Sequence, residues 1–211
     1  MVMAKRNYSK RGRSIEPSVQ TILLSSPVTN PGNTDQFYVD LSQCASLLNR
    51  RFYRQGINWA VAGIKILTNG QGSLTISKLP NTWVMSNAWT KGFKHWQKMN
   101  NQALAETESI RPKFLDFKIY ADDVHHQSGF ANNLLPVSLS GVATPGEWIA
   151  SKFVVPNTAG AVAAVNNFEV VATGQNYGPA GASGLNAVSL IEGYAASRAL
   201  PQPSIVTGKQ H

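Results

Sequence analysis

The sequence contains very little cysteine and little charge. Cys44 is the single cysteine in 211 residues, which excludes an intramolecular disulfide and a zinc site built from cysteines. Charged residues make up 14% of the chain, well below the roughly 25% of an average soluble protein. A surface with so few charges suggests that partners cover part of it.

Long hydrophobic runs are also missing. No stretch approaches the roughly 20 consecutive apolar residues of a membrane-spanning helix. The basic start of the chain is followed by polar residues rather than by the apolar core of a signal peptide. We therefore predict no membrane span and a protein that is intracellular when it is made.

The motifs of common enzyme sites are absent as well. The sequence holds no His-Glu-x-x-His pair, no phosphate-binding P-loop and no Gly-x-Ser-x-Gly elbow. Gly70 and Gly72 lack the third glycine and the following helix of a dinucleotide-binding loop. We predict that the chain is not an enzyme and that it has no catalytic residues and no cofactor.

One cluster, Asp122-Asp123-Val124-His125-His126, does carry side chains that ligate divalent cations. Neighbouring side chains of an extended segment point to opposite faces, so at most two of these groups converge easily on one ion. A polar loop after a strand explains the same residues, and we favour that interpretation. An ion site, for example between subunits, is the alternative; our prediction is that the chain has no metal site.

Positive charge is what the sequence has in excess, with a net charge of +8. Residues 1–14 hold five basic residues, no acidic residue and few large apolar side chains. Such a segment cannot bury enough apolar surface to offset the entropy of ordering it, so we predict a disordered basic arm over residues 1–16. Mobile cations on a compact domain are well suited to gathering nucleic acid. The candidate nucleic-acid-binding residues of the arm are Lys5, Arg6, Lys10, Arg11 and Arg13.

A second group of cations follows a predicted helix. Apolar residues from Leu41 to Phe52 share one helical face, Asp40 or Ser42 is a suitable N-cap, and Gly56 is a plausible C-cap. The arginines near the end of this helix lie largely off the apolar face, which is typical of a helix with a solvent-exposed basic end. An arginine cluster facing nucleic acid is the alternative. The candidate residues of this cluster are Arg50, Arg51 and Arg54.

A second helix is predicted from Asn87 to about Glu106. Trp89, Phe93 and Trp96 lie on one face, and packing in a core or an interface explains them better than base stacking. A row of three lysines on another face is a solvated surface or, alternatively, contacts phosphate. These lysines are Lys91, Lys94 and Lys98.

The rest of the pattern predicts short strands. Residues 57–67 are apolar at both odd and even positions, which is typical of a strand covered on both faces. With no βαβ alternation, we predict an all-β fold, a single jelly-roll antiparallel β-sandwich with short helical insertions. This shell domain would span residues 17–211, with loops dominating 157–197. The predicted strands lie within residues 17–30, 36–40, 57–67, 73–76, 82–85, 114–120, 148–155 and 168–172.

Two segments resemble the capsid proteins of small circular Rep-encoding single-stranded DNA viruses, including some akin to the bacilladnavirus group. They are residues 38–56 (YVDLSQCASLLNRRFYRQG) and residues 79–92 (LPNTWVMSNAWTKG). The likeness extends over about residues 1–155. It implies a jelly roll that self-assembles into an icosahedral shell, with the basic arm pointing inward onto single-stranded DNA.

The resemblance further implies a virion protein that enters the host nucleus during assembly, because short Lys/Arg clusters also serve as import signals. It does not identify the host receptor. The alternative is a non-viral β-barrel module with a basic tail that binds single-stranded nucleic acid. Against this, the predicted strands do not interleave basic and aromatic residues as a stacking platform would.

Overall fold

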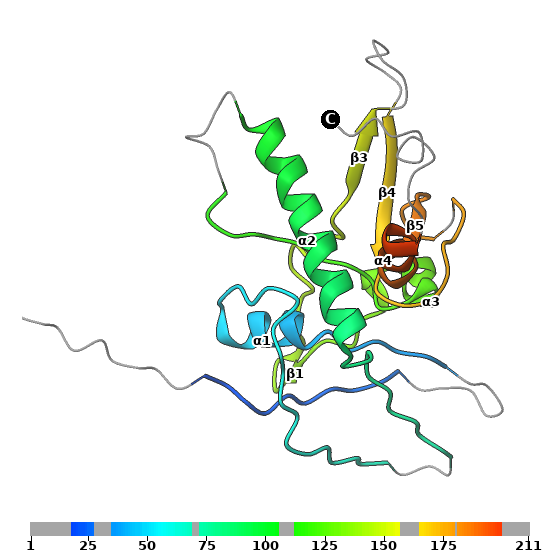
Figure 1. The fold of residues 1–211 in the computed structure, drawn as a ribbon. Coiled ribbons are helices and arrows are strands. Elements are labelled where there is room, and N and C mark those ends of the chain that lie inside the picture. The colour runs from blue at the N-terminus through cyan, green and yellow to red at the C-terminus, as the bar shows by residue number, and fades with distance from the viewer. Residues whose placement is uncertain are drawn as a thin grey trace, which may run out of the picture.

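The computed structural model of the chain describes residues 18–27, 35–68, 72–105, 112–156, 165–179 and 181–199. Within these ranges the fold consists of four α-helices and five short strands in two small sheets (Figure 1). The predicted jelly-roll β-sandwich is therefore wrong, because neither sheet is large enough to form a layer of a sandwich.

The larger sheet has three strands in the order β3-β4-β5. β3 (Phe153–Pro156) runs antiparallel to β4 (Val165–Val171), and β5 (Asn186–Ser189) runs parallel to β4. The smaller sheet is a hairpin of β1 (Val137–Ser138) and β2 (Gly141–Val142).

A long helix, α2 (Trp83–Ala103), packs against the C-terminal helix α4 (Leu190–Ala199). The Thr82 hydroxyl caps α2 by accepting a hydrogen bond from the Met85 amide at 3.3 Å. The helix predicted near Asn87 is thus confirmed but begins at Trp83. The strand predicted over residues 82–85 is wrong, because this cap turns the segment into the first helical turn.

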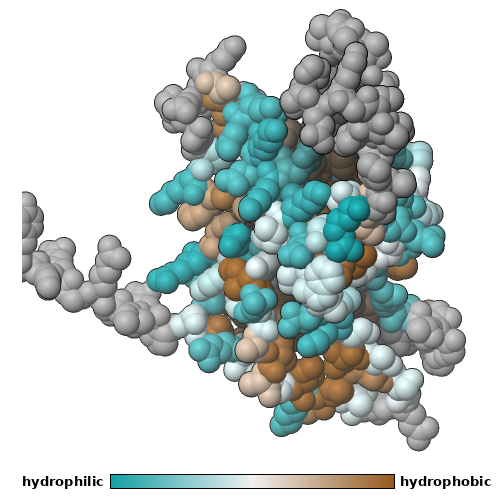
Figure 2. Space-filling model, viewed as in Figure 1, coloured by the Kyte–Doolittle hydropathy of each residue, from teal (hydrophilic) through white to brown (hydrophobic). Residues whose placement is uncertain are grey.

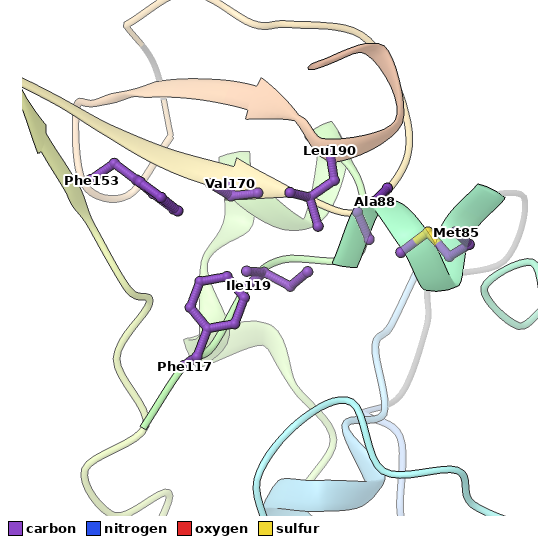
Figure 3. Packing of buried hydrophobic residues seen from close by; sticks show 8 residues of the cluster. Met85, Ala88, Phe117, Ile119, Phe153, Val170 and Leu190 are labelled. Carbon is purple, nitrogen blue, oxygen red and sulfur yellow. The ribbon is translucent and has the colours of Figure 1, made fainter. Parts of the chain in front are cut away.

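The main core lies where α2, α4 and the three-stranded sheet meet (Figure 3). Phe117 and Ile119, from an extended segment, belong to this cluster together with Met85 of α2 and Val170 of β4. Partly buried tryptophan and phenylalanine side chains of α2 pack against this cluster. The interpretation of the α2 aromatic stripe as packing residues is confirmed by these contacts, which involve Trp89, Phe93 and Trp96.

The first helix, α1 (Leu41–Asn49), begins as predicted. The Asp40 carboxylate caps it, accepting hydrogen bonds from the Ser42 and Gln43 amides. The helix ends earlier than Gly56, because Arg50 adopts a left-handed conformation with φ of 49°. Gly56 has φ of 82° and lies directly against the Trp89 ring, where any side chain would clash.

Two other helical turns complete the fold, α3 (Asp123–Ser128) and the 3-10 helix η2 (Phe130–Asn132). Several predicted strands are extended but unpaired, or form only isolated bridges: residue 24 pairs with residue 136, and residue 38 with residue 133. The loops predicted within residues 173–197 are wrong in part, because β5 and α4 lie there. The strand predicted near Phe168 is confirmed as part of β4.

Candidate functional site

Two extended stretches, residues 57–68 and 72–80, are exposed along their whole length; we call them the apolar segments. Neither stretch belongs to a helix or to one of the sheets. Ile64 is 62% exposed, Ile66 is 54% exposed and Leu67 is 78% exposed. The other large apolar side chains exposed here are Ile57, Trp59, Val61, Leu74, Ile76 and Leu79.

The apolar segments run along one end of the molecule, away from α4 and the three-stranded sheet (Figure 1). Figure 2 shows apolar side chains gathered at the same end. Val19 and Leu23 of the neighbouring extended chain are exposed as well. Full burial of one such side chain stabilises a protein by about 1.5–3 kcal/mol. Burial of the exposed side chains at this end would therefore be strongly favourable.

The strand predicted at residues 57–67 was expected to be covered on both faces, and here both faces are uncovered. The expectation of a strand covered on both faces is therefore not met among the residues that the structure describes. Trp59, near the start of this segment, contacts the body of the chain. Trp59 donates a hydrogen bond to the Ser42 hydroxyl at 3.2 Å and stacks obliquely on Tyr53.

The candidate arginines follow α1 and are all exposed, but they do not form one cluster of equivalent side chains. Arg50 occupies the C-cap of α1. The Arg54 guanidinium lies 5.8 Å from the ring centroid of Trp89 and 5.6 Å from that of Phe93, within cation–π range. Arg51 is exposed at the bend between them.

Arg54 borders an open cavity of about 520 Å³, which we call the Phe52 cavity. Its lining combines cations with aromatic and aliphatic side chains, and it contains no carboxylate. The lining residues are Phe52, Arg54, Ile57, Lys113, Phe114 and Leu115. The sequence pattern did not predict this cavity, because residues 52–57 and 113–115 are far apart in the chain.

The α2 lysines are exposed and point away from the core. The Lys91 ammonium lies 6.0 Å from the Tyr194 ring centroid, at the contact with α4. Lys94 and Lys98 border a shallow hollow whose other lining is mostly amide side chains. These positions suit a solvated face, the interpretation favoured from the sequence, and they leave phosphate contact open as the alternative.

The cluster at residues 122–126 is not a polar loop, so that prediction is wrong. Asp122 caps α3 by accepting a hydrogen bond from the His125 amide at 2.8 Å, and both histidines are buried. Nδ1 of His125 accepts from the Ala121 amide at 3.1 Å, so the proton resides on Nε2, which donates to Asn133 Oδ1 at 2.8 Å. The histidine is held as one neutral tautomer.

Tyr38 covers this histidine. Its ring stacks on His125 with centroids 4.1 Å apart, and its hydroxyl donates to Asp122 Oδ1 at 2.6 Å. Burial, followed by the hydrogen bond to Asp122, raises the pKa of Tyr38 above its usual value. Burial lowers the pKa of His125, and the Asn133 hydrogen bond only partly offsets that effect.

His126 is completely buried beside Glu169, with Nε2 and Oε2 3.1 Å apart. Neither ring nitrogen of His126 has a well-aligned hydrogen bond among the described residues. Ser183 donates to the Glu169 carboxylate at 2.6 Å. The serine hydroxyl thus contacts the acid and not the imidazole, an arrangement that does not activate it as a nucleophile.

Within the part of the chain that the structure describes, no group of three or more His, Cys, Asp or Glu residues could hold a metal ion. The same residues include no helix that is both long and apolar enough to cross a bilayer.

The predicted arm residues Lys5, Arg6, Lys10, Arg11 and Arg13 lie outside the described ranges. No family model, no curated protein and no solved structure matches the chain.

Proposed function

We propose that this chain is a structural protein that assembles with copies of itself into a closed shell and packages single-stranded DNA, as the capsid protein of a small DNA virus. The observation that carries this proposal is the exposure of the apolar segments. A single chain leaves these residues in water, whereas an assembly in which copies cover one another would bury them.

A second copy of the chain suits these segments better than an unrelated partner. An extended segment offers backbone donors and acceptors to another extended segment, and identical segments pair in a self-complementary way about a two-fold axis. This pairing satisfies the backbone edges, and the apolar side chains at both odd and even positions of residues 57–68 would be covered where other parts of the neighbouring copies pack on the two faces of the pair. A two-fold contact of this kind closes at a dimer, so the shell requires at least one further contact that joins these dimers to one another.

Nucleic acid fits the same assembly because each copy carries a net charge of +8. Like-charged subunits repel one another, and a polyanion inside the shell would remove that repulsion. The five cations of the basic arm, at Lys5, Arg6, Lys10, Arg11 and Arg13, would contact phosphate by releasing counterions. For about five contacts with a single strand, log affinity should fall against log salt with a slope of roughly −3.5.

The assignment to a DNA virus, and with it the location in the virion and in the host nucleus during assembly, comes from the resemblance of residues 38–56 and 79–92 to such capsid proteins. No enzymatic activity is part of the proposal. The fold of the subunit in the proposed shell is the mixed fold described above and not a jelly roll.

Electron microscopy of the purified chain, with absorbance ratios before and after nuclease treatment, tests the proposal. We expect closed particles of uniform size that retain nuclease-protected nucleic acid. Deletion of residues 1–14 should leave particles but lower their nucleic-acid content. A chain that stays a monodisperse monomer at physiological salt would contradict the proposal.

The second candidate is a non-viral module that binds single-stranded nucleic acid. The Phe52 cavity favours it, because cations beside aromatic rings are typical of single-strand binding. The β-barrel first considered for this module does not occur among the described residues. A monomer that binds single strands without forming particles would favour this candidate.

A further inference from the structure

The Phe52 cavity combines two aromatic rings with two cations at the surface. The ring centroids of Phe52 and Phe114 are 5.5 Å apart, with the rings tilted by 52°. Phe114 is 53% exposed, and the Lys113 ammonium lies 5.5 Å from its ring centroid. Arg54 supplies the second cation on the other side of the cavity.

The charge of the cavity is positive without compensation from its own lining, which contains no carboxylate. Asp116, two residues beyond Phe114, forms an ion pair with the buried Lys118. The Lys118 ammonium also lies 4.6 Å from the Trp148 ring centroid and 5.8 Å from that of Phe52. The acid near the cavity is therefore neutralised, and an anion that enters meets Arg54 and Lys113.

The wall formed by residues 52–57 is held in place by contacts with the core. Gln55 accepts a hydrogen bond from the Ile119 amide at 2.7 Å and donates to the Asp40 carboxylate at 2.7 Å. These bonds fix the residues on both sides of Gln55, and Phe52 packs on Trp148 with centroids 6.5 Å apart. On this side a ligand would thus meet a wall that is already formed, which limits the entropy lost on binding.

We propose that the Phe52 cavity binds one unpaired base of a single-stranded nucleic acid, which stacks on the exposed Phe114 ring with Phe52 beside it, while Arg54 and Lys113 contact the flanking phosphates. This inference rests on the proposed function, because its ligand is the strand that the shell packages. The volume of about 520 Å³ lies within the roughly 300–1,000 Å³ of ligand pockets. A duplex is a poor ligand, because its bases are already stacked on one another.

The test uses the full chain, a fluorescent oligothymidylate of about 15 nucleotides, and fluorescence anisotropy. Phe114→Leu, which keeps an apolar side chain but removes the ring, should weaken binding about 5- to 150-fold with an unchanged salt slope. Phe114→Trp should restore binding. Lys113→Gln should make the salt slope shallower by about 0.7.

Trp83→Leu is the matched control. Trp83 is also an exposed aromatic residue beside a cation, with the Arg198 guanidinium 5.4 Å from its ring centroid, but it lies outside the cavity. This variant should bind as the unmodified chain does. Ultraviolet cross-linking of an iodouracil-containing oligonucleotide to the unmodified chain requires no variant, and the cross-link should map to Phe52 or Phe114.

Two outcomes overturn this inference alone: an oligonucleotide affinity that Phe114→Leu leaves unchanged, or cross-links that map only to other parts of the chain. If Phe114→Leu prevents assembly but not oligonucleotide binding, the cavity belongs to a contact between copies and the inference is again wrong. If the unmodified chain binds no oligonucleotide at all, the packaging role in the proposed function fails together with this site.

Discussion

The apolar segments give the sharpest prediction. Ile64 and Ile66 are about half exposed or more, so replacing both with serine should change the free energy of unfolding of a single subunit by less than about 0.5 kcal/mol per residue. In a contact between two copies, each isoleucine would bury its remaining exposed surface and contribute about 1–1.5 kcal/mol. Four such side chains, two from each copy, amount to about 4–6 kcal/mol, or three to four orders of magnitude in the association constant.

Sedimentation velocity of the Ile64→Ser/Ile66→Ser variant measures this effect, with a denaturant melt to confirm that the subunit still folds. The control is Val124→Ser/Val154→Ser, which removes two exposed apolar side chains from α3 and β3, away from the apolar segments. We expect the control to assemble as the unmodified chain does and the test variant to remain as subunits. Equal assembly of both variants, or equal loss, would refute the reasoning.

Three further predictions concern the subunit itself. Phe117→Ala should lower the free energy of unfolding by about 3–5 kcal/mol in a denaturant titration, because the ring is fully buried in the core. The free energy of unfolding should fall as the pH drops below about 6.5, because burial lowers the pKa of His125 and the unfolded chain then binds the proton more readily. The His125→Gln variant should show a flatter dependence on pH. An equally steep loss of stability in that variant would contradict the prediction. Burial, followed by the charge of Asp40, raises the pKa of Cys44 to about 12. Thiol labelling at pH 8 should therefore be at least about 1,000-fold slower in the folded chain than in denaturant. Comparable labelling rates would contradict burial of the thiol.

Local signals in the sequence predicted α1 and α2, but α3 and α4 were both assigned to loops. Asp40 is a strong N-cap, and the spacing of Trp89, Phe93 and Trp96 defines a helical face that packs into the core. Such features act within one or two turns of chain, so they need no knowledge of the rest of the fold. The start of α2 was misplaced because Thr82 followed by Trp83 and Val84 has the composition of a strand as well as that of a capped helix.

The strand pattern was misleading for a different reason. Alternating or continuous apolar residues indicate an extended segment that requires cover, but they do not say which chain supplies its neighbour. Residues 57–68 are extended as expected and yet have no neighbouring strand among the residues that the structure describes. Counting each such segment as part of one sandwich produced the incorrect jelly roll.

For the site residues too, local features could be read from the sequence, but contacts made by the tertiary fold could not. Arg54 was a candidate because of its charge, but its aromatic neighbours come from α2 and from residues 113–115, contacts that depend on the tertiary fold. The two histidines of α3 were assigned to a polar loop, although Asp122, three residues before His125, was a readable N-cap signal. Their burial follows from the packing of Tyr38 and Glu169, which lie far away in the sequence.

Hydrogen exchange measured by mass spectrometry, on assembled material and on dissociated subunits, tests the central claim most directly. We predict that amides of residues 57–68 exchange rapidly in the subunit and become strongly protected in the assembly, while amides of α2 change little. Assemblies in which residues 57–68 exchange as fast as in the free subunit would show that other surfaces join the copies, and would contradict the account.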